Sequence, residues 1–105
     1  TFKLKTKKNV GVTTSPLYVV PSSTTTVVIG ITASNISGNN INVGIGITRA
    51  AADDVHLMKN IPIPQGSSFE FMQGNKIVLE TTDTITAKSD VNNSLDVALT
   101  IMEIT

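Results

Sequence analysis

The sequence lacks the residue types on which several protein classes depend. Its 105 residues include no cysteine, no tryptophan and only four aromatic side chains. Without cysteine, the chain can form neither a disulfide framework nor a thiolate metal site. No apolar run approaches the 18 or more residues of a membrane-spanning helix, and the first residues alternate instead of forming the apolar core of a signal peptide. We therefore expect synthesis in a cytosol and no membrane partner.

Charge is scarce and unevenly distributed. Charged residues make up 15% of the chain, with eight cationic side chains against eight carboxylates. Half of the cations, Lys3, Lys5, Lys7 and Lys8, lie within residues 1–8, which carry +4, so the remainder carries −4. Basic and aromatic residues are not interleaved as on a nucleic-acid platform, so we expect no nucleic-acid partner. The asymmetry favours contact between the basic segment and an acidic protein surface.

β-branched residues are abundant. The chain contains 15 Thr, 12 Ile and 11 Val, over a third of its length. Such side chains lose rotamer freedom in helices and fit pleated sheets. The length suits one compact domain, which would bury roughly two-thirds of its unfolded surface. We therefore expect residues 1–105 to form a single all-β domain.

Apolar and polar residues alternate with period two, and turn residues interrupt the alternation about every ten positions. Strands are predicted over residues 2–5, 17–20, 24–33, 41–48, 55–60, 68–72, 76–80, 84–88 and 95–104. The connections are predicted at residues 9–15, 34–40, 49–54, 73–75 and 90–94, with residues 61–67 extended between two sheets. Eight or nine short strands predict a two-layer antiparallel β-sandwich, either immunoglobulin-like or jelly-roll. A single small barrel is the alternative.

The same alternation predicts which side chains face the core. The inward residues are expected to be Val27, Ile29, Ile31, Ala33, Val43, Ile45, Ile47, Phe69, Phe71, Ile77, Leu79, Leu95, Val97, Leu99 and Ile101. After Ile101 the apolar positions shift to Met102 and Ile104, which a bulge or a two-sided contact would explain. We therefore include Met102 and Ile104 among the predicted interface residues.

Three glycines suggest a docking platform. Residues 24–33 and 41–47 are predicted to pair as an antiparallel hairpin, so that Gly30, Gly44 and Gly46 share its outer face. This face would be flat and almost free of side chains, which lets another backbone approach closely. Alternatively, the glycines permit strong local twist or a bulge.

The first strand carries lysines on one face and apolar residues on the other. It could act as an arm that pairs with an acidic neighbour, such as another copy of the chain. Alternatively, it is an edge strand whose lysines prevent aggregation. The interface residues predicted here are Phe2, Lys3, Lys5, Lys7 and Lys8.

No combination of residues predicts catalysis. The single histidine, His56, shares a strand face with Asp54, but one imidazole and one carboxylate make a poor metal site, so a solvated surface is expected. Gly44-Ile45-Gly46 lacks the third glycine and the helix of a dinucleotide-binding loop. We expect no enzyme, no metal and no cofactor, and a small hydrolase is the least favoured class.

The sequence KNIPIPQGSSF at residues 59–69 is followed by GNKIVLE at 74–80 and by the closing segment at 95–104. Together with residues 21–27, these segments resemble small virion structural proteins of tailed bacteriophages, especially those of cyanobacterial and marine phages. The resemblance implies a β-sandwich subunit on the particle: a head decoration or cement protein, or a neck or tail component. It carries over no catalytic residue.

These observations predict a non-enzymatic virion structural protein, in the first place a capsid decoration or cement subunit. It would form homo-oligomers and bind other virion proteins, above all the major capsid protein. It would be made in the host cytoplasm and reside in the virion. The alternative is a neck, tail or fibre component that binds a host glycan, for which Tyr18 is the candidate aromatic residue.

Overall fold

The computed structural model describes residues 1–49, 54–71 and 76–104. The predicted turn at 73–75, the last residue of the strand predicted at 68–72, most of the loop predicted at 49–54 and the Phe71 side chain lie outside this description. No helix occurs in the described ranges, and every strand pairing is antiparallel. The prediction of the all-β class is confirmed.

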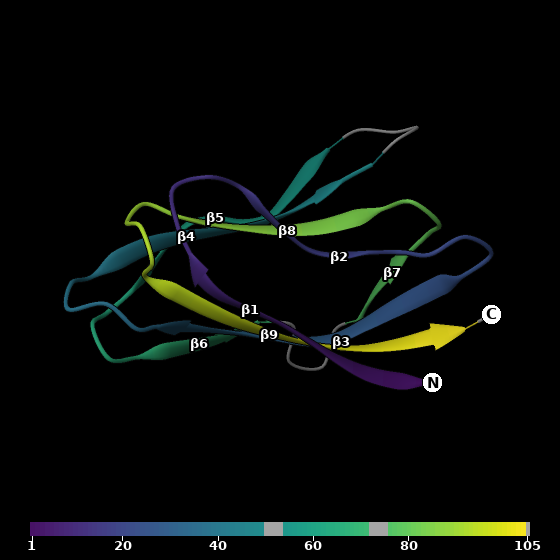
Figure 1. Ribbon diagram of the computed structural model, residues 1–105, viewed down its shortest axis with the longest axis horizontal. Coiled ribbons are helices and arrows are strands. Elements are labelled where there is room, and N and C mark those ends of the chain that lie inside the picture. The colour runs from purple at the N-terminus through teal and green to yellow at the C-terminus, as the bar shows by residue number, and fades with distance from the viewer. Residues whose placement is uncertain (50–53, 72–75, 105) are drawn as a thin grey trace.

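In the part of the chain that the structure describes, nine strands form two layers (Figure 1). Sheet A contains β1 (Phe2–Val10), β9 (Leu95–Ile104), β3 (Thr25–Asn35), β6 (Ser68–Phe71) and β7 (Ile77–Leu79). Sheet B contains β2 (Ser15–Val19), β8 (Thr84–Ser89), β4 (Ile41–Thr48) and β5 (Val55–Ile63). The two-layer sandwich is therefore confirmed, and the alternative of a single barrel is wrong.

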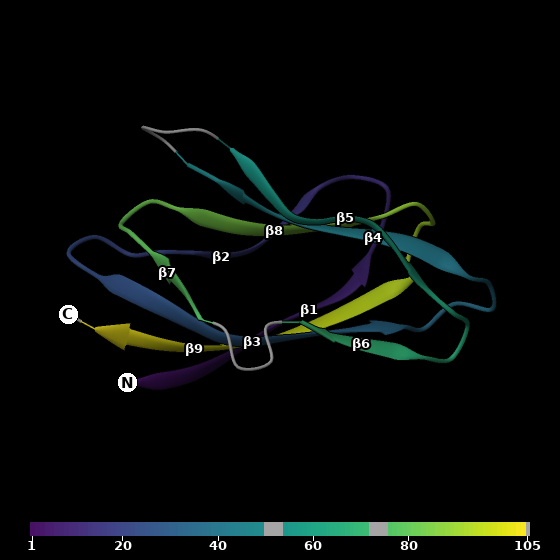
Figure 2. The same cartoon turned by 180° about the vertical axis from the view of Figure 1, so that it is seen from behind.

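The strand order distinguishes between the two predicted sandwich topologies. Sheet A has the order β1-β9-β3-β6, with β7 also on β3, and sheet B has the order β2-β8-β4-β5. The first two strands lie in different sheets, whereas they share a sheet in the immunoglobulin arrangement. Taking β6 and β7 as one interrupted strand, the chain forms the two interleaved four-stranded sheets of a jelly roll. Figure 2 shows the same two layers from behind.

The predicted hairpin between residues 24–33 and 41–47 is wrong. β3 pairs with β6, β7 and β9, and β4 pairs with β5 and β8. The connection between β3 and β4 therefore crosses from one layer to the other. Alternation specifies which face of a strand is buried, but it does not specify the neighbouring strand. Two strands with one apolar face each can meet across the core as well as side by side.

The prediction that Val27 faces the core is also wrong. The register between β3 and β9 shifts between Val28 and Gly30, which leaves Ile29 as an inserted residue. Before the shift Val28 is buried, and after it Ile31 is buried. This β-bulge changes the parity of the strand, so Val27 lies on the outer face of sheet A.

Most of the other predicted core residues are confirmed. The fully buried or nearly buried ones are Ile31, Ala33, Val43, Ile45, Ile47, Leu79, Leu95, Val97, Leu99 and Ile101, and Phe69 and Ile77 pack against them. Many of these side chains are β-branched, so they lose little rotamer freedom on a pleated surface. The two sheets are held together by this single apolar layer.

Prolines mark both edges of sheet B. Pro16 lies in β2 and Pro62 lies in β5, the two outermost strands of this sheet. Proline has no backbone N–H, which restricts it to edges, strand ends and bulges. After Ile63 the chain crosses to β6 in sheet A, as predicted for residues 61–67. By contrast, β1 continues to Val10, into residues predicted as a connection.

Two isoleucines of β9 test the assignment of inner and outer faces. Ile101 is fully buried and Ile104 is half exposed. Ile101→Ala should lower the free energy of unfolding by about 2–5 kcal/mol, because it leaves a cavity in the core. Ile104→Ala should lower it by less than about 1 kcal/mol. Urea denaturation measures both, and equal losses would contradict the assignment.

Candidate assembly surfaces

An apolar row crosses the outer face of sheet A from edge to edge. Phe2 pairs with Met102, Met102 with Val27, and Val27 with Val78. Directly paired residues point to the same face of a sheet, and in β9 the adjacent Ile101 points into the core. The row therefore faces outward, and it ends on exposed side chains at both edges, since Phe2 is 72% exposed and Val78 is 60% exposed.

Leu4 and Ile104 extend this row along the strands. Leu4 is 65% exposed and Ile104 is 50% exposed. We call the set of Phe2, Leu4, Val27, Val78, Met102 and Ile104 the outer-face patch. Contiguous exposed apolar side chains mark surfaces that contact other molecules. Three residues predicted at an interface, Phe2, Met102 and Ile104, belong to this patch.

The apolar shift at the end of β9 does not involve a bulge in that strand. The register of β9 with β1 and β3 is regular from Ile101 to Ile104. Alternation therefore continues: Met102 and Ile104 point outward, and Glu103 takes the inner position between them. A carboxylate at an inner position needs polar partners, because burial without them is costly.

Glu103 obtains these partners from the opposite end of the chain and from sheet B. Lys3 Nζ lies 2.8 Å from Glu103 Oε1, and the Tyr18 hydroxyl donates a hydrogen bond to Oε2. The Tyr18 hydroxyl also lies 2.9 Å from Thr26 Oγ1. The bond from Lys3, and next the bond from Tyr18, lower the pKa of Glu103. Burial, followed by the bond to Glu103, raises the pKa of Tyr18.

The lysines of β1 fall into two pairs. Lys3 and Lys5 share the inner face with Ile101 and Leu99, their partners in β9. Lys3 binds Glu103, and Lys5 Nζ lies 5.8 Å from the centre of the Tyr18 ring. These two lysines therefore contact their own chain.

Lys7 and Lys8 lie at the other end of β1. Both are exposed, close to a register shift that precedes Val10. There the backbone N–H of Asn9 donates to Asp96 Oδ1 at 3.0 Å. This end of the strand presents two exposed cationic side chains.

The glycines predicted to form one platform lie on opposite sides of the molecule. Gly30 pairs with Thr100 in sheet A, whereas Gly44 and Gly46 are in β4 of sheet B. The single platform is therefore wrong, because it required β3 and β4 to be neighbours. What remains is the pair of glycines on the outer face of sheet B.

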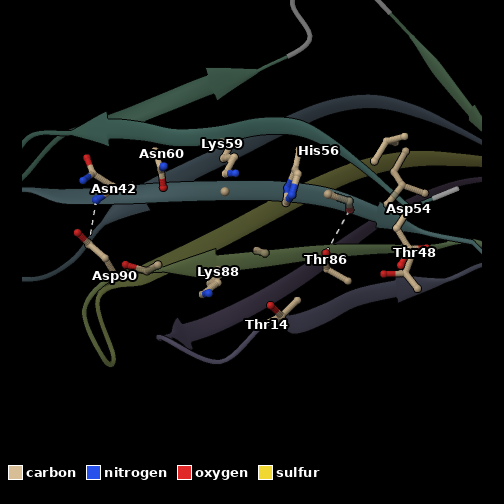
Figure 3. A pocket seen from close by; sticks show the side chains of 16 residues that line it. Thr14, Asn42, Thr48, Asp54, His56, Lys59, Asn60, Thr86, Lys88 and Asp90 are labelled. Carbon is tan, nitrogen blue, oxygen red and sulfur yellow. Dashed lines mark hydrogen bonds between the residues drawn. The ribbon is translucent and has the colours of Figure 1, made fainter.

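Gly44 and Gly46 line a polar groove of about 470 Å³. Gly44 is paired with Lys88, and Gly46 is paired with Thr86 and His56. Figure 3 shows Lys59 and Lys88 on opposite sides of β4, with Asn42 and Asp90 near one end of the groove.

The two glycines differ in how much space the surrounding chain leaves for a side chain. A Cβ atom at Gly46 would lie 3.0 Å from the Val55 carbonyl oxygen, which is tighter than an ordinary contact. A Cβ atom at Gly44 would have one neighbour within 4 Å, the Met58 carbonyl oxygen at 3.5 Å. Packing of β4 against β5 thus explains Gly46. It does not explain Gly44.

His56 and Asp54 both line this groove. Asp54 Oδ1 accepts a hydrogen bond from the backbone N–H of Arg49 at 2.9 Å. Within the described ranges, no group of three or more histidine or acidic side chains could hold a metal ion. The same ranges contain no helix long and apolar enough to cross a membrane.

Sequence reasoning missed several residues of these surfaces. Val27 was assigned to the core because the bulge in β3 leaves no sequence signal. Val78 had a visible signal, since three apolar residues follow each other at 77–79 and one must face outward. Glu103 also interrupts an apolar run at an inner position, but its partners Lys3 and Tyr18 are distant in sequence.

Comparison with known proteins supports the fold. No known protein family and no curated protein matches the chain. Among solved structures, a chain of Bacillus endospore appendages, described as a novel family of disulfide-linked pili, is similar with a TM-score of 0.56. The two are 16% identical, and the match covers 100% of this chain and 88% of that one. At this identity the likeness shows a shared fold.

The bonds to Glu103 should make stability depend on pH. The folded pKa of Glu103 is below its ordinary value of 4.5, so the unfolded chain binds the proton more tightly. The resulting stabilisation is present above the unfolded pKa and is lost as the pH falls through the folded pKa. Urea unfolding from about pH 6 to about pH 2 should show Glu103→Gln losing less stability than wild type. Parallel curves would contradict this role.

The two glycines of the groove provide a matched pair. Gly46→Val should destabilise the protein by about 1–3 kcal/mol through overpacking against β5. Gly44→Val should change stability by less than about 1 kcal/mol, because its side chain enters the groove. Thermal unfolding with sedimentation tests both stability and assembly. If Gly44→Val left both the thermal stability and the assembly of the protein unchanged, the groove would not be a docking platform.

Proposed function

We propose that this chain is a non-enzymatic structural subunit that assembles with copies of itself and with other proteins of a particle. The outer-face patch carries the proposal, because it places four apolar side chains in one cross-strand row on the outside of sheet A and two more beside that row. A partner that covers the patch removes this apolar surface from water, which is the main favourable term in protein association.

The likeness to a pilus chain supports assembly as the role of this fold. The appendages to which that chain belongs are described as disulfide-linked. The 105 residues here contain no cysteine, so these residues cannot form disulfide links. Apolar burial and backbone pairing at strand edges are the interactions that the described surfaces offer.

In its specific form, the proposal is a virion structural protein of a tailed bacteriophage, and in the first place a capsid decoration or cement subunit. The resemblance of residues 59–69 and 74–80 to such proteins supports this form, and jelly rolls are common in viral capsids. The partners would be further copies and the major capsid protein. The protein would be made in the host cytoplasm and reside in the virion.

The groove on sheet B favours a second candidate, a neck, tail or fibre component that binds a host glycan. Its lining offers amide, hydroxyl and ammonium groups, which could bind sugar hydroxyls. We rank this candidate lower because Tyr18, the aromatic residue considered for such a site, is 7% exposed and binds Glu103. It cannot present its ring to a sugar.

Locating the protein in purified particles tests the proposed function. Immunogold labelling and quantitative mass spectrometry should find many copies on the head, as expected of a cement subunit. A few copies at one vertex would favour the neck or tail, and binding to a glycan array would favour the second candidate. Absence from particles would contradict the virion role.

Variants of the patch test the surface itself. Phe2→Ser with Ile104→Ser should weaken attachment by about 2 kcal/mol or more, roughly thirtyfold in affinity, because each change removes an exposed apolar side chain that a partner would bury. Val19→Ser is the matched control, since Val19 is 54% exposed but lies in β2 of sheet B. Equal attachment of both variants would exclude the outer-face patch.

A further inference from the structure

We propose that the groove of sheet B binds an acidic saccharide, whose single carboxylate lies over Gly44 between Lys59 and Lys88. This inference rests on the second candidate function, and it specifies the class of glycan and the groups that recognise it. The groove and the outer-face patch are on different sheets, so a ligand in the groove and a partner on sheet A do not compete for the same surface.

Two rows of residues cross the groove, and each row has a glycine in the middle. In the first row Gly44 of β4 is paired with Lys88 of β8. In the second row Gly46 lies between Thr86 of β8 and His56 of β5. Because neither glycine has a side chain, β4 forms the floor of the groove, and β5 and β8 supply its walls. A floor of this kind lets a ligand approach the backbone closely.

A β-bulge in β5 adds a second lysine to the wall opposite Lys88. The register between β4 and β5 shifts beside Gly44, so that two residues of β5, Lys59 and Asn60, lie opposite this one glycine. Asn60 has a φ of 54°, a left-handed conformation that asparagine tolerates. Both side chains are exposed and line the groove. The bulge thus brings an ammonium group and an amide to the same point of the wall.

Lys59 and Lys88 supply the positive charge at the centre of the groove. Within the described ranges, ion pairs are formed by Lys3 and Arg49, and neither lysine of the groove takes part in one. Two strand spacings, roughly 10 Å, separate their backbones, and Figure 3 shows them on opposite sides of β4. A lysine side chain is long enough for both ammonium groups to reach an anion over Gly44. Such an anion is attracted by both charges.

The carboxylates of the groove lie toward its two ends and are already hydrogen bonded. Asp90 Oδ1 accepts a hydrogen bond from the backbone N–H of Asn42 at 2.9 Å, and Asp54 Oδ1 accepts one from Arg49 at 2.9 Å. Asn42 and Arg49 lie at opposite ends of β4. The groove is therefore positive over Gly44 and negative toward both ends. This arrangement favours a ligand with one central acidic group over a polyanion, whose outer charges would be repelled.

The uncharged side chains of the groove suit the hydroxyl groups of a sugar. Asn42 and Asn60 offer amides, and Thr48 and Thr86 offer hydroxyls. Both kinds of group can donate and accept hydrogen bonds. The described residues of the lining include no aromatic side chain, so a sugar ring has no aromatic surface on which to stack. Recognition therefore depends on hydrogen bonds and on the charge of the ligand, and a neutral saccharide lacks the charge.

An acidic peptide is the main rival for the groove. Extended peptides bind sheets by forming main-chain hydrogen bonds with an exposed edge strand. The floor of the groove is β4, which pairs with β8 on one side and with β5 on the other. Its backbone groups are therefore used within sheet B, and a peptide would be held by its side chains alone. This favours the saccharide as the occupant.

Two trisaccharides test the inference: one has a central glucuronic acid, and the other has glucose at that position. Titration calorimetry measures their affinities, and the backbone amide NMR signals of Gly44 and Gly46 report where they bind. The acidic trisaccharide should bind about tenfold more tightly than the neutral one and should shift both glycine signals. Salt at about 0.5 M should remove most of this difference, because it screens exposed charges.

Variants of the groove test the groups that recognise the ligand. Lys59→Gln and Lys88→Gln should each weaken binding of the acidic trisaccharide about fivefold, and the double variant should bind both trisaccharides equally. Lys8→Gln is the matched control, since Lys8 is exposed but lies in β1 of sheet A. Gly44→Val should weaken binding of both trisaccharides, because its side chain occupies the floor. Circular dichroism establishes that each variant is folded.

Three results would overturn the inference: a wild type that does not prefer the acidic trisaccharide, a double lysine variant that keeps this preference, or tighter binding of a peptide with one central glutamate. Equal binding of both trisaccharides with shifted glycine signals would overturn recognition by charge and leave the glycan-binding candidate standing. Because particle localisation is measured separately, absence of the protein from the neck, tail and fibres would overturn that candidate and leave the ligand class standing.

Discussion

The side chains between the two sheets form one apolar core. Because side chains alternate along a strand, the residues that point into this core decide which residues face outward. In β9 the inner positions are apolar as far as Ile101, and the next inner position is Glu103. The polar group at this end of the sandwich is therefore inside, where Lys3 and Tyr18 bind it. The apolar residues on either side of Glu103 face outward as a consequence of strand alternation.

The outer-face patch thus arises because, at this end of the sandwich, a carboxylate points inward and apolar side chains point outward. At the same end of the molecule, the bulge in β3 turns Val27 outward and places it beside Met102. The two effects combine because β9 lies between β1 and β3 in sheet A, and Figure 1 shows the start of β1 and the end of β9 at the same end of the molecule. The residues of this surface are positioned by pairing between strands and not by a loop.

The two faces of the sandwich offer different chemistry. Sheet A presents the outer-face patch and edge strands without proline, which suits contact with other proteins. Sheet B presents a polar groove over Gly44 and edges that contain Pro16 and Pro62. Assembly through sheet A would leave the groove of sheet B accessible, so a structural role and a ligand at the groove are compatible.

The sequence alone determined the all-β class, the approximate strand positions and most of the buried residues, from Ile31 to Ile101, because period-two alternation is a local property of the chain. It also singled out Phe2, Met102 and Ile104 as candidate interface residues, and the structure places all three on the outer face of sheet A. Only the tertiary structure decided that β3 and β4 lie in different sheets, that Val27 faces outward and that Glu103 meets Lys3 and Tyr18. These features depend on pairing between distant segments and on one inserted residue, and alternation carries no information on either.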